Sequence, residues 1–121
     1  MKTNAITREV IGAAMRVHTA LGPGLLESAY RACLARELEL QGLRYETEVP
    51  VPVIYRGLTI PTAYRMDLLV EEVVIVEIKA LSRMTDNHEA QLLSHLRLGR
   101  RTVGLLINFH VRACATALSE W

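Results

Sequence analysis

The sequence has few of the features that mark a metal-binding cysteine protein, a membrane protein or a repeat protein. Its 121 residues include two cysteines, Cys33 and Cys114, with no CxxC spacing, so we expect both to be small buried hydrophobic residues. No apolar run reaches the roughly 18 residues that a membrane-spanning helix needs, and the N-terminus has no signal-peptide hydrophobic region. Repeats, linkers and low-complexity runs are also missing. We therefore expect one cytoplasmic domain over residues 1–121, without membrane contact.

Lysine is scarce as well, because 12 arginines stand against only Lys2 and Lys79. The net charge of +1 does not by itself demand a polyanionic partner. Arginine offers a planar fork of donors that suits phosphate, whereas lysine is a compact point charge. An interior lysine in a chain that otherwise uses arginine suggests that position 79 requires a compact ammonium group.

The composition, with 50% hydrophobic and 22% charged residues, is that of a globular protein. Apolar residues at helical spacing predict a first helix over residues 7–21, with Thr7 as N-cap and Gly22-Pro23-Gly24 as its end. A second helix is predicted over residues 25–41, ended by Gly42. Its expected buried stripe consists of Leu26, Ala29, Tyr30, Cys33, Leu34 and Leu38.

Three strands are predicted next, over residues 44–55, 58–70 and 73–79. Short turns at Arg56-Gly57 and Glu71-Glu72 join them into an antiparallel meander. Because proline cannot donate to a strand ladder, Pro50, Pro52 and Pro61 indicate an edge strand or a bulge.

The C-terminal third begins with a polar connection over residues 81–86. A helix is predicted from Asp86, its N-cap, to Leu98, with Glu89 at capping-box spacing and Gly99 at its end. A buried strand over residues 102–109 should lie parallel to the third strand after a crossover. The tail, residues 111–121, is short and compatible with a helix. The pattern predicts an α/β (α+β) domain with a four-stranded mixed sheet flanked by helices.

Charged residues interrupt the apolar third strand, and this conflict is the main indication of function. Glu77 and Lys79 lie two apart in a strand and therefore share a face. Asp67 lies about four residues before the Glu71-Glu72 turn and Glu77 about five after it, which places the two carboxylates within one position of each other. Burying such charges is costly unless something pairs with them.

Two carboxylates beside a lysine suit phosphodiester hydrolysis. Mg2+ and similar hard cations take oxygen ligands from one or two carboxylates, water and substrate phosphate. An adjacent ammonium can orient the attacking water or offset charge in the transition state. The structural alternative is an internal ion pair of Lys79 with Glu77 or Asp67, and the spacing alone leaves both readings open.

Polar residues on the helices admit a structural interpretation when each is taken alone. Glu27 could complement the helix dipole, and Tyr30, three residues later, could pack in the core with its hydroxyl at the rim. His88, Gln91 and His95 form a polar stripe on the third helix. Arg97, Arg100 and Arg101 form the best candidate basic patch for nucleic acid, although a solvated helix end explains them equally well.

Several motifs in combination resemble a known family. Asp67 followed by Glu77-Ile78-Lys79 resembles the D…(D/E)xK signature of the PD-(D/E)xK nuclease superfamily. The run Gly24-Leu-Leu-Glu27-Ser-Ala-Tyr30 resembles the motif of the GxxExxY protein family, a branch of that superfamily. Gln91 resembles the glutamine of the helix that follows the ExK strand. The resemblance extends over roughly residues 11–109 and implies a restriction-endonuclease-like αβββαβ core.

The resemblance also implies roles for individual residues. Glu27, Asp67 and Glu77 would be ligands of Mg2+ or Mn2+, Lys79 the catalytic lysine, and Gln91 a residue that positions water, substrate or Lys79. The family pattern often has tyrosine four residues after the glutamine, where this chain has His95. Tyr30 and His95 would support the site.

Two functions follow as hypotheses. The first is a metal-dependent nuclease that hydrolyses phosphodiester bonds of DNA or RNA, with nucleic acid as its partner and a homodimer as a way to enlarge the binding surface. The second is a non-catalytic module that keeps the fold and binds nucleic acid or protein.

Overall fold

The first helix begins four residues earlier than the sequence pattern predicts. The computed structural model describes residues 2–80, 86–101, 103–109 and 115–120. Helix α1 spans Thr3–Leu21, and it ends where Gly22 adopts a φ of 68° and donates its N–H to the His18 carbonyl at 2.8 Å. Thr7 is therefore not the N-cap: its hydroxyl bonds the Asn4 carbonyl at 2.9 Å inside the helix, as threonine does with a carbonyl one turn back.

Helix α2 spans Glu27–Leu40 and packs beside α1. Tyr30, Leu34 and Leu38 are buried as expected, and Cys33 is half-buried. Leu26 is predicted to be buried, but its exposed fraction is 77%. It is exposed because it is the N-cap and lies before the first turn of the helix. The buried stripe thus begins one turn later than the sequence pattern indicates.

Strands β1 (Tyr45–Tyr55), β2 (Leu58–Val70) and β3 (Val74–Lys79) form the predicted antiparallel meander. The two turns use positive φ values, 46° at Arg56 and 50° at Glu71, which a tight reversal requires. β1 is an edge strand, and its register shifts between Val51 and Val53. Both expectations from the prolines are confirmed.

Helix α3 (Asp86–Leu98) and strand β4 (Val103–Asn108) follow as predicted. β4 lies parallel to β3, from the pair Val74↔Val103 to the pair Lys79↔Asn108. The connection over residues 81–85 lies outside the described residues, as do His110 and Cys114.

The tail corrects the sequence analysis. Instead of a helix, Ala115–Glu120 form strand β5, which pairs antiparallel with β4 and extends the sheet to the order β1-β2-β3-β4-β5. The physical reason is that an uncovered β4 would leave a row of unpaired backbone groups at the sheet edge. The four predicted strands are present, with this fifth strand beside them.

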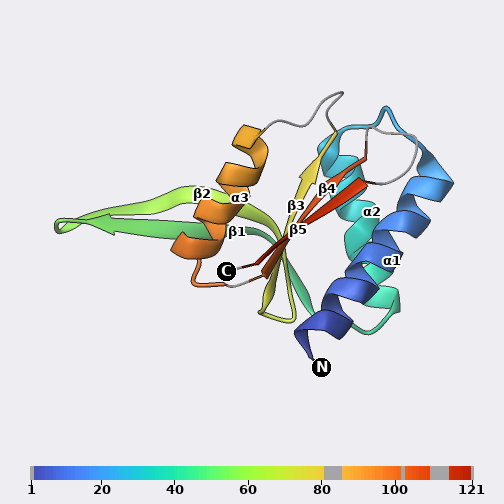
Figure 1. Ribbon diagram of the computed structural model, residues 1–121, viewed down its shortest axis with the longest axis horizontal. Helices are drawn as coiled ribbons and strands as arrows, with labels where there is room; N and C mark the ends of the chain where they lie inside the picture. Colours follow the sequence, from blue (N-terminus) through green and yellow to red (C-terminus); the bar gives the residue numbers. More distant parts are fainter. Residues whose placement is uncertain (1, 81–85, 102, 110–114, 121) are drawn as a thin grey trace.

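Helices cover both faces of the sheet (Figure 1). Alternate residues of β3, Val74, Val76 and Ile78, pack in the cluster that contains α1 and α2, whereas Ile75 packs in the cluster that contains α3. α3 approaches β4 so closely that a Cβ on Gly104 would lie 2.8 Å from Leu92 Cδ1. No described helix is long and apolar enough to span a membrane.

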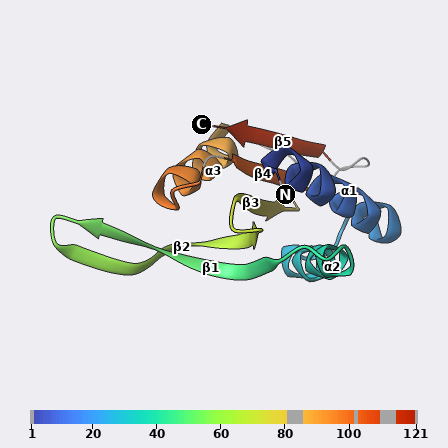
Figure 2. The same cartoon turned by 90° about the horizontal axis from the view of Figure 1, so that it is seen from below.

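The β1–β2 hairpin is much longer than β3 and extends beyond the rest of the sheet (Figures 1 and 2). β2 pairs with β3 only over Leu68–Val70 and then continues away with β1. The C-terminal half of β3 consequently loses its β2 neighbour after Val76. This divergence creates the space in which the candidate site lies.

Candidate active site

The two acidic residues of the predicted motif lie opposite each other in the backbone register where β2 leaves β3. The paired register ends at Leu68↔Val76, and its continuation places Asp67 opposite Glu77. The expectation that the two residues lie within one position of each other is confirmed. Glu77 is buried and Asp67 is half-buried, so both lie at the border between the core and solvent.

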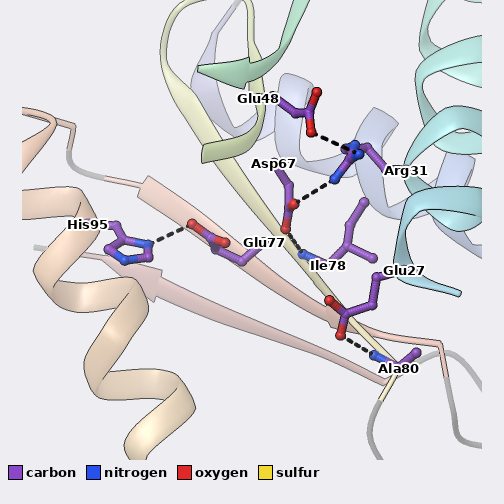
Figure 3. A network of polar contacts seen from close by, with 8 residues as sticks. All are labelled: Glu27, Arg31, Glu48, Asp67, Glu77, Ile78, Ala80 and His95. Carbon is purple, nitrogen blue, oxygen red and sulfur yellow. Dashed lines mark hydrogen bonds and ion pairs between the residues drawn. The ribbon is translucent and has the colours of Figure 1, made fainter. Parts of the chain in front are cut away.

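Two carboxylates accept hydrogen bonds from backbone N–H groups at the C-terminal end of β3, where β2 is no longer paired with it (Figure 3). The Ile78 N–H donates to Asp67 Oδ2 at 2.8 Å, and the Ala80 N–H donates to Glu27 Oε2 at 3.1 Å. Alternate N–H groups of a strand point to opposite neighbours, so these two would have no acceptor once β2 has left. Asp67 and Glu27 therefore lie along the same free edge of β3.

Arg31 of α2 is a site residue that the sequence analysis missed. Its guanidinium bonds Asp67 Oδ1 at 3.3 Å and Glu48 Oε1 at 3.2 Å (Figure 3). The available signal was its position four residues after Glu27, which puts both on one helix face. Arg31 consequently fixes Asp67 from the side of α2.

Glu77 points to the opposite side, toward α3. Its side chain is 8% exposed, and Oε1 lies 2.8 Å from His95 Nδ1 (Figure 3). Burial raises the pKa of the Glu77 carboxyl, an effect that the contact with His95 opposes. The nearby charge of Asp67 raises this pKa further and that of Lys79 lowers it. Glu77 is thus a buried carboxyl held by a histidine.

Tyr64 of β2, also missed from the sequence, holds His95 in turn. The two rings stack with centroids 3.8 Å apart, and the tyrosine hydroxyl donates to the His95 carbonyl at 2.5 Å. Burial raises the pKa of Tyr64 to about 12, and the charge of Glu77 adds to the rise. The hydroxyl therefore stays protonated and remains a donor.

Lys79 lies beyond Glu77 on the same face of β3 and is half-buried. Asp67 pairs with Arg31 and Glu77 with His95, and within the part of the chain that the structure describes neither carboxylate forms an ion pair with Lys79. The ion-pair alternative is therefore not what the structure shows.

Two residues of the polar stripe of α3, Gln91 and His95, line an open groove of about 390 Å3. Gln91 is exposed there, one turn from His95, and the lining residues are Asn87, Ala90, Gln91, Ser94 and His95. Arg97, Arg100 and Arg101 follow His95 toward and beyond the end of the helix. The groove thus joins the predicted positioning residue to the histidine that contacts Glu77.

Tyr30 supports the site from the core rather than lining it. Its ring is fully buried and stacks on Phe109 at 4.4 Å. The hydroxyl donates to the Gly22 carbonyl at 2.6 Å and accepts the Leu25 N–H at 3.1 Å. Core packing is confirmed, but the hydroxyl is not at the rim, because it ties down the loop that precedes Glu27.

Comparison with known families supports the resemblance at the level of the superfamily. The family model described as the PD-(D/E)XK nuclease superfamily matches residues 4–118. The chain belongs to this superfamily. No curated protein and no solved structure matches the chain significantly.

Members of the PD-(D/E)xK superfamily generally use divalent metals, and the donors of this site fit such an ion in part. Asp67 and Glu77 offer oxygen atoms, the ligands that Mg2+ and Mn2+ prefer. Among residues 2–80, 86–101, 103–109 and 115–120, no three His, Cys, Asp or Glu side chains form a group that could hold a metal. Glu27 as a third ligand therefore stays a prediction.

Replacing Glu77 with glutamine should change how stability depends on pH. A carboxyl whose pKa is raised on folding stabilises the fold fully below its unfolded pKa, and this contribution is lost as pH rises through the folded pKa. We therefore expect the unfolding free energy of Glu77→Gln minus that of the wild type to increase as the pH rises above about 4.5, the ordinary pKa of a glutamate carboxyl. Urea unfolding in EDTA measures it, and a difference that shrinks with pH would contradict the assigned burial.

Proposed function

We propose that this chain is a divalent-metal-dependent nuclease that hydrolyses phosphodiester bonds of DNA or RNA, and that it belongs to the GxxExxY branch. The observation that carries the proposal is the position of Asp67 opposite Glu77 with Lys79 on the same strand face, at the point where β2 and β3 diverge. Membership of the superfamily supports it.

Asp67 and Glu77 would hold Mg2+ or Mn2+, with Glu27 as a further ligand. The ion, when bound, would lower the pKa of a water molecule and stabilise charge on the scissile phosphate. Lys79 would orient the attacking water and offset charge that develops on the phosphate. His95 would hold Glu77 in place through its contact with Oε1, and Gln91 would position water or substrate from the α3 groove.

One observation favours the second candidate, a non-catalytic binding module. Both oxygens of Asp67 already have protein partners, Arg31 and the Ile78 N–H, as in a purely structural network. In a nuclease these contacts would position Asp67 before a cation binds. In a binding module Asp67 would have no function beyond these structural contacts. Cation binding separates the two.

Addition of Mn2+ should raise the melting temperature of the wild-type protein. A cation that binds only the folded state stabilises it by about 2.7 kcal/mol at 100 times its dissociation constant. Asp67→Ala and the isosteric Asp67→Asn should abolish the gain, and Glu9→Gln, at an exposed position of α1, should retain it. The melting temperature with Mn2+ and with EDTA is the measurement. A wild-type protein that gains nothing would favour the binding module.

A further inference from the structure

The outer part of the β1–β2 hairpin, residues 49–66, is an arm whose base packs against α3 and whose tip projects beyond the other described elements (Figure 2). Its tip exposes four large apolar side chains: Ile54, Tyr55, Leu58 and Ile60 are 72%, 63%, 61% and 41% exposed. The register places Tyr55, Leu58 and Ile60 on one face of the hairpin and Ile54 on the other. Exposed apolar side chains gathered on one face of a folded protein mark an interaction site. The arm is therefore a candidate binding surface.

The charged residues of the arm and of the C-terminal part of α3 are of one sign. Residues 49–66 contain Arg56 and Arg65 and residues 90–101 contain Arg97, Arg100 and Arg101, whereas all 13 acidic residues lie elsewhere in the chain. The net charge of +1 conceals this separation. A surface with arginine and no carboxylate is complementary to a phosphate backbone.

A groove of about 460 Å3 lies between the arm and the C-terminal end of α3. Pro52, Val53 and Ile54 line it from the arm, and Arg97, Leu98 and Arg100 line it from α3. Tyr64 connects the two walls through its stack on His95, the residue that contacts Glu77. The basic groove and the candidate site are thus linked by α3, through the stack of Tyr64 on His95.

We propose that the arm and the end of α3 bind double-stranded DNA, with the arm in a groove of the duplex. A two-stranded ribbon fits the B-form major groove, about 12 Å wide, whereas the A-form major groove of RNA is deep and narrow. Single strands are usually gripped by a row of aromatic rings, but the tip offers only Tyr55. The proposal rests on the proposed function and names duplex DNA as its substrate class.

Two arginines can be removed without adding backbone strain. Arg56 and Arg100 have φ values of 46° and 56°, a region that asparagine tolerates well. Arg56→Asn/Arg100→Asn therefore removes two charges from the arm and groove. Arg8→Gln/Arg36→Gln removes two exposed charges from α1 and α2 and is the matched control.

Fluorescence anisotropy in EDTA should show that the wild type binds a labelled DNA duplex more tightly than the same sequence as single-stranded DNA or as duplex RNA. The double asparagine variant should lose about tenfold in duplex affinity, and its salt dependence should fall by about 0.9 in log–log slope per arginine. The control should bind like the wild type. Equal or tighter binding of single strands or duplex RNA would overturn the proposal, as would wild-type affinity in the asparagine variant.

Two further measurements separate this proposal from neighbouring ones. The asparagine variant should keep the melting-temperature gain with Mn2+. If the wild type lacks that gain but binds duplex DNA, the nuclease proposal fails and the duplex-binding proposal stands.

Sedimentation of the wild type and of Leu58→Ser tests self-association. A dimer that Leu58→Ser dissociates, with duplex binding unchanged, would make the arm an interface between copies and overturn the proposal.

Discussion

Lys79→Met should reduce phosphodiester cleavage by about 100- to 1,000-fold or more, because it removes a positive charge from the place where charge develops on the phosphate. The fold should tolerate the change or gain slightly, since Lys79 forms no ion pair with Asp67 or Glu77 in the described residues. Single-turnover cleavage and urea unfolding of the same preparation measure the two effects.

Lys2→Met is the matched control for this experiment, because Lys2 is the other lysine of the chain and is exposed before α1. It should leave both cleavage and stability unchanged. A destabilisation of about 3–5 kcal/mol in Lys79→Met would instead show that a buried ion pair had been broken. Lys79 would then be a structural residue.

Tyr30→Ala should destabilise the fold by about 3–5 kcal/mol, because a fully buried ring that stacks on Phe109 is lost. Tyr30→Phe should cost about 1–3 kcal/mol, since the Gly22 carbonyl and the Leu25 N–H lose their hydroxyl partner. Tyr55→Phe, at the exposed tip of the arm, should change stability by less than about 0.5 kcal/mol. Urea unfolding gives all three values.

One outcome would contradict the structural role of the Tyr30 hydroxyl. If Tyr30→Phe keeps full stability but loses cleavage by orders of magnitude, the hydroxyl acts on substrate rather than on the Gly22–Leu25 loop. The geometry predicts the reverse, because the ring has no exposed surface from which to reach a ligand.

Elements with strong local signals could be predicted from the sequence. The meander, its two turns and the edge position of β1 follow from alternation and from the prolines at positions 50, 52 and 61. The register at Asp67 and Glu77 follows from counting outward from the Glu71 turn, because pairing begins at Val70↔Val74. These features depend on residues close together in the chain.

Features that depend on partners outside the local sequence pattern could not be predicted. Ala115–Glu120 form β5 along the edge of β4, and no periodicity within the tail sequence records this partner. Thr7 carries the signature of an N-cap, but the helix continued to Thr3 and its hydroxyl found a carbonyl within the helix. In both cases tertiary or neighbouring backbone groups overrode the local pattern.

The same limit applies to the candidate site. Asp67, Glu77 and Lys79 could be chosen as candidates from spacing and Glu27 from the family resemblance, but the partners of each carboxylate could not be predicted. Arg31 and Tyr64 reach the site through contacts with residues 36 and 31 positions away, and no short motif encodes these separations. The spacing of the candidate catalytic residues therefore does not predict the residues, such as Arg31 and Tyr64, that hold them in place.

Cleavage by the purified protein tests the central proposal most directly. Wild-type protein with Mn2+ or Mg2+ is incubated with single-stranded DNA, duplex DNA, branched DNA and RNA, beside Glu77→Ala and the control Glu9→Gln. The account predicts metal-dependent cleavage, strongest on duplex DNA, that Glu77→Ala abolishes and Glu9→Gln retains. Absence of cleavage of every substrate, or activity that survives in Glu77→Ala, would contradict it.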